Sequence, residues 1–423
     1  MNSPKVVWRV LERVVTGPLA FSFLFVPPIV RAQDDPYQAT DQRALGAPGS
    51  VTTSTAALAN WLTGPCRNEK EKARAIFRWI TANISYDADA FFSGRNIRGS
   101  AGDALRSRKG VCEGYASLFT ELCRKGGLTV EEVSGFAKGY GYQPGENPAL
   151  KPNHSWNAVR LDGRWELIDC TWGAGYIGDD RRFHRQFNPH YFLTPPGVFI
   201  YDHFPEEEQW QLLDPPRSRD AYERTVYVKP AFFALGFSVG QNDAGTIETD
   251  GDLTIRLDVA RSVAGAATLL TGNSPLGEEC SFVQQEGGAL VVRAALPKGE
   301  HTLRVFAKTA RTPGEYAWIL DYRVVSRVGS AESFPKKFSG FDDRGAVLVE
   351  PYTGVIGAGT SRFHVRAPGA EQAAVIAGET WTVLEGSNGD FSGNATILPG
   401  VVTLCARYPG HEEWESLLEF RGK

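Results

Sequence analysis

A cysteine, a histidine and an aspartate in the first half of the chain carry the side chains that nucleophilic catalysis requires. They are Cys112, His154 and Asp169. A thiol attacks a carbonyl carbon as its thiolate, so a nucleophilic cysteine needs a base or a cationic partner. An imidazole can be that partner, and a carboxylate can fix its tautomer and stabilise its charged form. The three residue types predict acyl transfer through a thioester on Cys112.

The residues that follow Cys112 have the period of a buried helix. Apolar side chains recur at i, i+3, i+4, i+7 and i+8, namely Tyr115, Leu118, Phe119, Leu122 and Cys123. Gly126-Gly127 supplies a C-terminal stop. Cys112 is therefore predicted at the helix N-terminus, where free N–H groups and the helix dipole favour a thiolate.

The positions of His154 and Asp169 follow from a predicted hairpin. Two strand-like segments flank Asp162-Gly163, a strong signal for a two-residue turn. If Leu161 pairs with Arg164, His154 and Asp169 become diagonal neighbours on one face, with backbones about 7–8 Å apart. A slip of one residue would place them on opposite faces, so this prediction depends on the turn.

Four motifs surround these residues. They are Lys109-Gly-Val-Cys112-Glu-Gly-Tyr-Ala, Ser134-Gly-Phe-Ala-Lys-Gly-Tyr-Gly-Tyr142, Asn153-His154-Ser-Trp-Asn-Ala-Val159 and Trp165-Glu-Leu-Ile-Asp169-Cys-Thr-Trp172. Together they resemble the transglutaminase-like superfamily, and most closely its kyphoscoliosis peptidase and cytokinesis-protein branch. The resemblance implies a papain-like Cys-His-Asp fold with Cys112, His154 and Asp169 at the catalytic positions. It does not define the reaction, because the superfamily contains cross-linkers, peptidases, amidases and catalytically silent binding domains.

Four aromatic residues near the motifs are candidates for the substrate cleft: Tyr115, Tyr142, Trp156 and Trp172. Core packing explains the two tryptophans equally well. The segment 139–152, rich in Gly and Pro, precedes His154 and is either a rim or lid over the cleft or a surface connection without a role.

Three other histidines of the same region could compete with His154 as the base. They are His184, His190 and His203, and no pattern places them on the hairpin. No cluster of His and Cys has the spacing of metal ligands, and no glycine-rich phosphate motif occurs. We therefore predict neither a metal nor a cofactor.

The first 32 residues have the pattern of a secretion signal. Basic residues open the segment, an apolar run follows over residues 14–30, and Ala32 ends a compact cleavage motif. Prolines in the run disfavour a stable membrane span, although an uncleaved anchor is the alternative. We expect a mature protein that is secreted or periplasmic.

The chain of 423 residues is long enough for two to four domains, and its net charge of −4 disfavours nucleic acid as a partner. We expect a linker over residues 33–54 and a catalytic domain over residues 55–215. Within that domain, helical periodicity covers residues 56–61 and 68–84.

The second half of the chain predicts two tandem β-sandwiches, over residues 220–330 and 331–423. Short alternating strands separated by turn residues have the spacing of immunoglobulin-like domains. The pattern is repeated: the segment 299–303 returns at 400–404, and 320–323 returns at 418–421. The expected fold class is therefore α+β, a transglutaminase-like core followed by two immunoglobulin-like sandwiches.

Six cysteines allow more than one arrangement. With Cys112 as a free nucleophile five remain, so at least one more is unpaired. Cys66, Cys123 and Cys170 could include one disulfide within the catalytic domain.

These observations favour an exported cysteine enzyme that acts on peptide or amide bonds of a protein, a peptide or a cell-wall peptide. Hydrolysis is favoured over transfer, because an amine acceptor requires a cleft that excludes water. A catalytically silent scaffold that binds a protein or cell-wall partner is the main alternative, and an adhesion module built on the sandwiches is a third.

Overall fold

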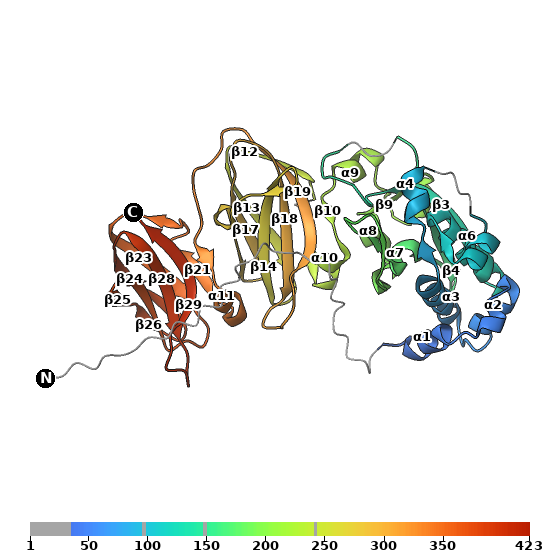
Figure 1. Ribbon diagram of the computed structural model, residues 1–423, viewed down its shortest axis with the longest axis horizontal. Coiled ribbons are helices and arrows are strands. Elements are labelled where there is room, and N and C mark those ends of the chain that lie inside the picture. The colour runs from blue at the N-terminus through green and yellow to red at the C-terminus, as the bar shows by residue number, and fades with distance from the viewer. Residues whose placement is uncertain (1–34, 95–98, 147–149, 241–242) are drawn as a thin grey trace.

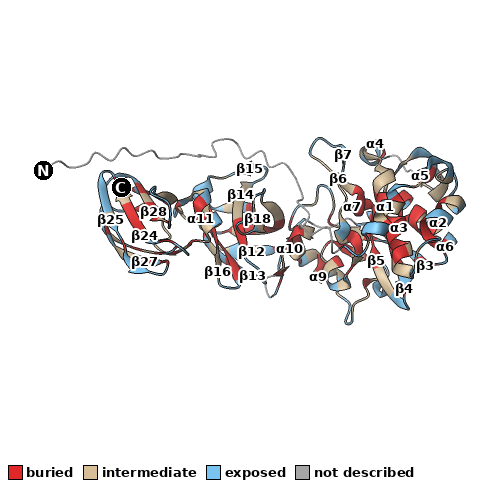
Figure 2. Cartoon of the chain, turned by 90° about the horizontal axis from the view of Figure 1, so that it is seen from below, coloured by how far each residue is buried: buried red, intermediate tan, exposed pale blue. Residues whose placement is uncertain are grey.

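The computed structural model describes residues 35–94, 99–146, 150–240 and 243–423, which form three domains in a row (Figure 1). A domain of helices and one main sheet is followed by two β-sandwiches, so the predicted fold class is confirmed. Buried residues gather inside each domain (Figure 2). The predicted signal segment 1–32 lies outside the described residues. Within the described ranges, no helix is long and apolar enough to cross a membrane.

In the part of the chain that the structure describes, six α-helices precede the main sheet of the first domain. They are α1 (Gln38–Leu45), α2 (Thr55–Thr63), α3 (Glu69–Asn83), α4 (Ala88–Ser93), α5 (Ala101–Ser107) and α6 (Cys112–Lys125). The stripe predicted after Cys112 is confirmed, because all five of its side chains are fully buried on α6. Asn68 caps α3 by accepting a hydrogen bond from the N–H of Glu71. The α3 and α6 helices share one apolar core.

The prediction of a linker over residues 33–54 is wrong for the residues that the structure describes. Helix α1 lies against α3, where Arg74 is almost completely buried. The two oxygens of Asp41 accept hydrogen bonds from Nε and Nη2 of Arg74, both at 2.7 Å. A buried guanidinium requires such a partner, so a tertiary ion pair holds a segment whose own composition favours a loop.

The main sheet is antiparallel, with strand order β8-β5-β4-β3-β9. Its strands are β3 (Thr129–Ala137), β4 (His154–Leu161), β5 (Arg164–Ile168), β8 (Phe192–Thr194) and β9 (His203–Pro205). Leu161 pairs with Arg164, so the predicted hairpin register is confirmed. Asp162 and Gly163 form the turn with φ of 50° and 82°. Positive φ at both central residues is the signature of the type I′ turn.

A buried amide joins helix α6 to the hairpin. Asn157 of β4 donates from Nδ2 to the carbonyl of Ala116 at 3.2 Å and to Oγ1 of Thr120 at 3.0 Å. Because both acceptors lie on α6, this side chain sets the position of the helix over the strand that begins with His154.

Smaller elements complete the first domain and lead to the second. They are β1 (Ser85–Tyr86), β2 (Lys109–Gly110), α7 (Cys170–Ala174), β6 (Gly175–Ile177), β7 (Phe183–Arg185), α8 (Pro196–Phe199) and α9 (Arg219–Arg224). Gly135 of β3 pairs with His154 on one side and with Pro205 of β9 on the other. Strand β3 therefore lies between the strands that carry His154 and His203.

The first sandwich follows α9. Its strands are β10 (Tyr227–Val228), β11 (Phe237–Ser238), β12 (Thr246–Thr249), β13 (Asp252–Val259), β14 (Val263–Thr271), β15 (Ser274–Pro275), β16 (Ser281–Glu286), β17 (Ala289–Ala295), β18 (Gly299–Thr309) and β19 (Ala317–Ser326). One sheet has the order β10-β19-β18-β14-β15 with β12 beside β19, and the other has the order β11-β13-β17-β16. The short helix α10 (Pro230–Ala234) packs on β19.

The second sandwich repeats this topology, with each strand label higher by ten. Its strands are β20 (Lys336–Lys337), β21 (Val347–Glu350), β22 (Val355–Ile356), β23 (Gly359–Arg366), β24 (Gln372–Ala377), β25 (Thr380–Val383), β26 (Glu385–Ser387), β27 (Asp390–Ile397), β28 (Gly400–Arg407) and β29 (Glu415–Gly422), with α11 (Ser339–Arg344). The repeat extends to detail: the pairings β18–β19 and β28–β29 each contain a bulge, after Val305 and after Leu404. The predicted internal repeat is therefore confirmed.

The turn of the β4–β5 hairpin provides a test of the fold. Replacing Gly163 by alanine forces a side chain into a left-handed conformation, so we expect the free energy of unfolding to fall by about 1–2 kcal/mol. Gly197→Ala is the matched control, because Gly197 has an ordinary φ and open space around its Cα. Urea unfolding measures both variants, and an equal effect of the two would contradict the assignment of the turn.

Candidate active site

The geometry of the site begins with Cys112, which is the first residue of helix α6 and is half-buried. His154 is the first residue of β4. Asp169 follows β5 and caps the N-terminus of α7. A helix start, a strand start and a helix cap thus bring the three predicted catalytic side chains together.

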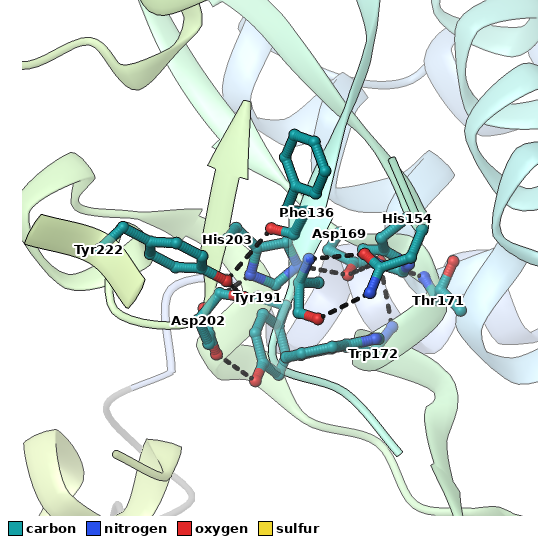
Figure 3. Close-up of polar contacts among 11 residues, drawn as sticks. Phe136, His154, Asp169, Thr171, Trp172, Tyr191, Asp202, His203 and Tyr222 are labelled. Atoms are coloured by element: carbon teal, nitrogen blue, oxygen red, sulfur yellow. Dashed lines mark hydrogen bonds and ion pairs between the residues drawn. The ribbon is translucent and has the colours of Figure 1, made fainter. Parts of the chain in front are cut away.

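The carboxylate of Asp169 is fully buried and faces His154 (Figure 3). Its Oδ2 lies 2.8 Å from Nε2 of His154. Its Oδ1 accepts hydrogen bonds from the backbone N–H groups of Thr171 at 2.7 Å and Trp172 at 3.0 Å. The first turn of α7 thereby fixes the orientation of the carboxylate, and the carboxylate fixes the ring of His154.

The protonation of His154 reflects two opposing effects. Burial disfavours the charged imidazolium, but the negative charge of Asp169 and hydrogen bonds with Asp169 and Cys112 raise the pKa of His154 to about 10. Because Nε2 faces Asp169, Nδ1 is the ring nitrogen that remains for Cys112. The arrangement favours an imidazolium beside the sulfur at neutral pH.

The pKa of Asp169 is shifted in the opposite direction to that of His154. Burial alone would raise the pKa of its carboxyl group, but the charge of His154 and hydrogen bonds from His154 and His203 hold that pKa well below its usual range. The carboxylate is therefore ionised although it is fully enclosed.

Two of the four predicted cleft residues lie beside His154. The Trp156 ring is stacked near the imidazole, with 6.1 Å between ring centroids, but it is almost fully buried and belongs to the core below the site. The Trp172 ring lies 5.3 Å from the same imidazole and is half-buried. Trp172 is thus the one of this pair that is open to solvent at the site.

Tyr115 and Tyr142 are placed elsewhere. Tyr115 is fully buried, and its hydroxyl donates to the carbonyl of Ile84 at 2.8 Å, which makes it a core residue of α6. Tyr142 packs against Tyr227 of the first sandwich, with ring centroids 4.9 Å apart. Neither side chain contributes to an open cleft beside Cys112, and at Tyr142 the segment 139–152 contacts the neighbouring domain.

An aromatic group not predicted from the sequence lies beside the nucleophile. Burial raises the pKa of Tyr86, and the nearby Cys112 adds to the shift. From Tyr86 the rings of Phe91, Phe92 and Tyr140 follow one another at centroid distances of 5.1 to 5.9 Å. Phe91 and Tyr140 are more than two-fifths exposed, at 43% and 46%. Tyr140 belongs to the segment 139–152, for which the sequence offered a rim or lid as one alternative, and the adjacent Phe91-Phe92 pair was the signal for the other rings.

His203 has a position that the sequence did not predict. It is fully buried, with Nε2 3.1 Å from Oδ2 of Asp169 and Nδ1 2.6 Å from Oδ1 of Asp202. Both ring nitrogens are therefore engaged by carboxylates, and neither remains for proton exchange with Cys112.

The other two competing histidines also have partners away from Cys112. His184 bonds to Asp180 at 2.9 Å on an exposed strand, and His190 is stacked on Phe233 of the next domain. Burial lowers the pKa of His190, which disfavours its charged form. His154 is therefore the histidine positioned to act on the sulfur.

Three buried side chains could in principle ligate a metal, because ligand atoms of His154, Asp169 and His203 lie within 4.8 Å of one another. The nitrogen–oxygen distances of 2.8 and 3.1 Å are those of hydrogen bonds. A metal here would have to displace the proton of each bond. The arrangement fits a hydrogen-bonded carboxylate in which every donor already has its acceptor.

All six cysteines have free thiols, so Cys66, Cys123 and Cys170 do not form the one disulfide that the sequence allowed among them. Cys123 and Cys170 are core residues, and burial raises the pKa of both thiols well above the usual value. The sulfurs of Cys123 and Cys170 are packed in the apolar core instead of forming a disulfide.

Comparison with known proteins assigns two parts of the chain to domain families. Residues 56–170 match the model of the transglutaminase-like superfamily, and residues 219–335 match that of the KY-like, immunoglobulin-like domain. The chain thus contains a transglutaminase-like domain followed by an immunoglobulin-like domain, as the sequence motifs predicted.

Individual relatives match over part of their length. Kyphoscoliosis peptidase of Mus musculus is 36% identical over 253 residues, which are 59% of this chain and 38% of the relative. Cytokinesis protein 3 of Schizosaccharomyces pombe is 25% identical over 196 residues, 45% of this chain and 21% of the relative. The chain therefore spans well under half the length of these relatives. A solved structure described as a candidate cysteine protease from Cytophaga hutchinsonii is 26% identical, covers 30% of this chain and 44% of its own, and has a TM-score of 0.23.

The pairing of Cys112 with His154 predicts selective alkylation by iodoacetamide. At pH 6 an ordinary thiol is less than about 1% thiolate, whereas a charged His154 favours the thiolate of Cys112. Since the pKa of His154 is about 10, this effect should persist from pH 6 to about pH 9. We expect Cys112 to react at least about 10-fold faster than the other five thiols at pH 6.

His154→Gln is the matched variant, because its amide keeps a donor for Asp169 but loses the charge. It should reduce alkylation of Cys112 to the rate of an ordinary thiol, and mass spectrometry of the labelled peptides measures both rates. An unchanged rate would contradict the pairing. Dialysis against a chelator should leave the rate unaltered, and a change would instead assign a metal to the two histidines and Asp169.

Proposed function

We propose that the transglutaminase-like domain is a cysteine enzyme that cleaves peptide or amide bonds through Cys112, His154 and Asp169. The observation that carries the proposal is the continuous contact from Cys112 to His154 to Asp169, in which His154 has a pKa of about 10. A charged imidazole beside a thiol at a helix N-terminus is the resting state that thiol nucleophiles need.

The first half of the proposed reaction forms an acyl-enzyme. The Cys112 thiolate attacks the amide carbonyl carbon, and a carbon–sulfur bond forms as the carbonyl oxygen becomes an oxyanion. The backbone N–H of Cys112, at the first position of α6, has no acceptor within its own helix and can donate to that oxyanion. The carbon–nitrogen bond then breaks as Nδ1 of His154 gives its proton to the leaving amine.

The second half regenerates the thiolate. Water gives a proton to Nδ1 of His154 as its oxygen attacks the thioester, and the carbon–sulfur bond breaks to release a carboxylic acid. Asp169 keeps the Nε2 proton of His154 in place throughout, so the same nitrogen acts first as acid and then as base. Water is the favoured acceptor, because transfer to an amine would require a second bound substrate.

The aromatic group beside Cys112 supports peptides with apolar side chains as substrates. Phe91 and Tyr140 expose apolar surface and contact each other, and Phe91 also packs on Tyr86, whose hydroxyl is influenced by the nearby Cys112. A substrate that covers these rings would gain about 25 cal/mol of binding free energy for each Å² of apolar area removed from water. A peptide with an aromatic residue near the cleaved amide is therefore a better candidate than one with alanine.

Export is part of the proposal. Residues 1–32 would direct the chain out of the cytoplasm and be removed, so that the mature protein starts at Gln33. The intact mass of protein recovered outside the cytoplasm tests this, and retention of Met1 would contradict cleavage.

A peptide assay tests the proposed reaction. We expect the wild-type protein to hydrolyse amide bonds in a library of peptides and cell-wall fragments, with phenylalanine preferred to alanine, and Cys112→Ser to lose at least about 1,000-fold of that rate. Adding a primary amine should leave free acid as the main product by mass spectrometry. A dominant amide product would make the protein a transferase.

If the assay detects no cleavage, the alkylation rate of Cys112 decides between two explanations. If Cys112 is selectively alkylated but no fragment is cleaved, the substrate class is wrong. If Cys112 reacts no faster than the other thiols and nothing is cleaved, the domain is a silent scaffold that binds a protein or cell-wall partner.

A further inference from the structure

A chain of buried polar contacts extends from the active site through residues that the proposed reaction does not use. Oδ2 of Asp169 accepts from His203, Nδ1 of His203 contacts Asp202, and the hydroxyl of Tyr191 donates to Oδ2 of Asp202 at 3.0 Å. Figure 3 shows these contacts in sequence from His154 to Tyr191. All of these side chains are buried.

Counting protons restricts the state of His203. Nε2 must carry a proton to donate to the ionised Asp169. The single proton between Nδ1 and Asp202 belongs either to the imidazole, giving an imidazolium and a carboxylate, or to Asp202, giving two neutral groups. In both cases His203 and Asp202 together have no net charge. In both cases the proton on Nε2 of His203 faces Asp169, and the pair adds no net charge to the site.

Aromatic rings isolate this pair from water. The His203 ring is stacked on Phe199 with centroids 4.0 Å apart, and it meets Trp172 at 4.4 Å and Trp156 at 5.1 Å. Hydrogen bonds strengthen in such a low-dielectric environment, and a lost partner is costly there because water cannot replace it.

Asp202 is itself held in place by its backbone. Its carbonyl accepts from the N–H of Lys138 at 3.0 Å and from the hydroxyl of Tyr222 at 3.2 Å. Other titratable groups also act on this pair: His190, from the turn before β8, interacts electrostatically with His203, and Lys138 and Lys229 interact with Asp202. The orientation of His203 is therefore determined from three elements, β3, α9 and the segment before β9.

We propose that His203, locked by Asp202, is a positioning residue that holds the Asp169 carboxylate in the orientation His154 requires. With His203 in place the two oxygens of Asp169 have four donors, two from α7 and two from histidines. This inference rests on the proposed roles of His154 and Asp169, and it extends the site from three residues to five.

Two substitutions at one position separate this role from simple packing. In His203→Gln the side-chain amide nitrogen takes the place of Nε2 and keeps the donor to Asp169. In His203→Asn it takes the place of Nδ1 and keeps only the donor to Asp202. Both are neutral amides, so each variant leaves one carboxylate contact intact and their effects on folding should be similar.

The readout is alkylation of Cys112 by iodoacetamide as a function of pH, which requires no substrate. We expect His203→Asn to slow alkylation at pH 6 about 10-fold and to move the acid limb of the profile to higher pH, because Asp169 then protonates more easily. His203→Gln should keep the wild-type profile within about 3-fold. Equal profiles for two variants of equal melting temperature would reduce His203 to packing and overturn the proposal.

A measurement on the wild-type protein keeps the proposal testable if the variants do not fold. Nitrogen chemical shifts of 15N-labelled histidine rings should show His203 protonated at Nε2 from pH 5 to pH 9. A ring with a bare Nε2 would overturn the proposal. Neither readout depends on turnover, so a failed peptide assay with these results intact would disprove only the proposed substrate.

Discussion

The structure of the first domain depends on one enclosed negative charge. Transferring a carboxylate out of water costs several kcal/mol unless donors replace its hydration. Asp169 obtains two of them from the first turn of α7, one from the start of β4 and one from β9. Helix α7 and strands β4 and β9 thus meet at this carboxylate, and removing any one of the four donors would leave part of a buried charge without a hydrogen-bond partner. Stability and the geometry of the site have a common origin here.

Local signals in the sequence predicted one half of this arrangement. The Asp-Gly turn sets the register that brings His154 to Asp169, and the spacing of Tyr115 and Leu118 predicts the helix that starts at Cys112. His203 could not be found in this way, because it lies 34 residues after Asp169 on a strand that pairs with β3. Helix α1 was missed for a similar reason: its position depends on an ion pair with Arg74, and no local pattern encodes a partner so far along the chain. The same apolar stripe that located α6 also explains why Tyr115 belongs to the core.

The transglutaminase-like domain and the first sandwich are physically continuous. The match to the immunoglobulin-like domain begins at residue 219, within the segment that forms α9. Tyr222 of that helix donates to the backbone of Asp202, and Lys138 after β3 donates from Nζ to the carbonyl of Thr225 at 2.8 Å. A segment assigned by sequence to the second domain therefore supports the polar chain of the first. Tyr142, which the sequence offered as a cleft residue, instead packs against Tyr227 of this sandwich, although Tyr140 of the same loop is exposed.

The position of Gly135 between β4 and β9 has a consequence for how much variation the site allows. A Cβ atom at this position would lie 2.4 Å from Cη2 of Trp156 and 2.3 Å from the carbonyl oxygen of Phe204. Contacts that short do not occur, so even one methyl group would spread the two strands that flank residue 135. His154 and His203 both reach Oδ2 of Asp169 only because residue 135, between their two strands, has no side chain. Residue 135 must therefore be glycine, because no larger side chain fits between these strands while His154 and His203 both contact Asp169.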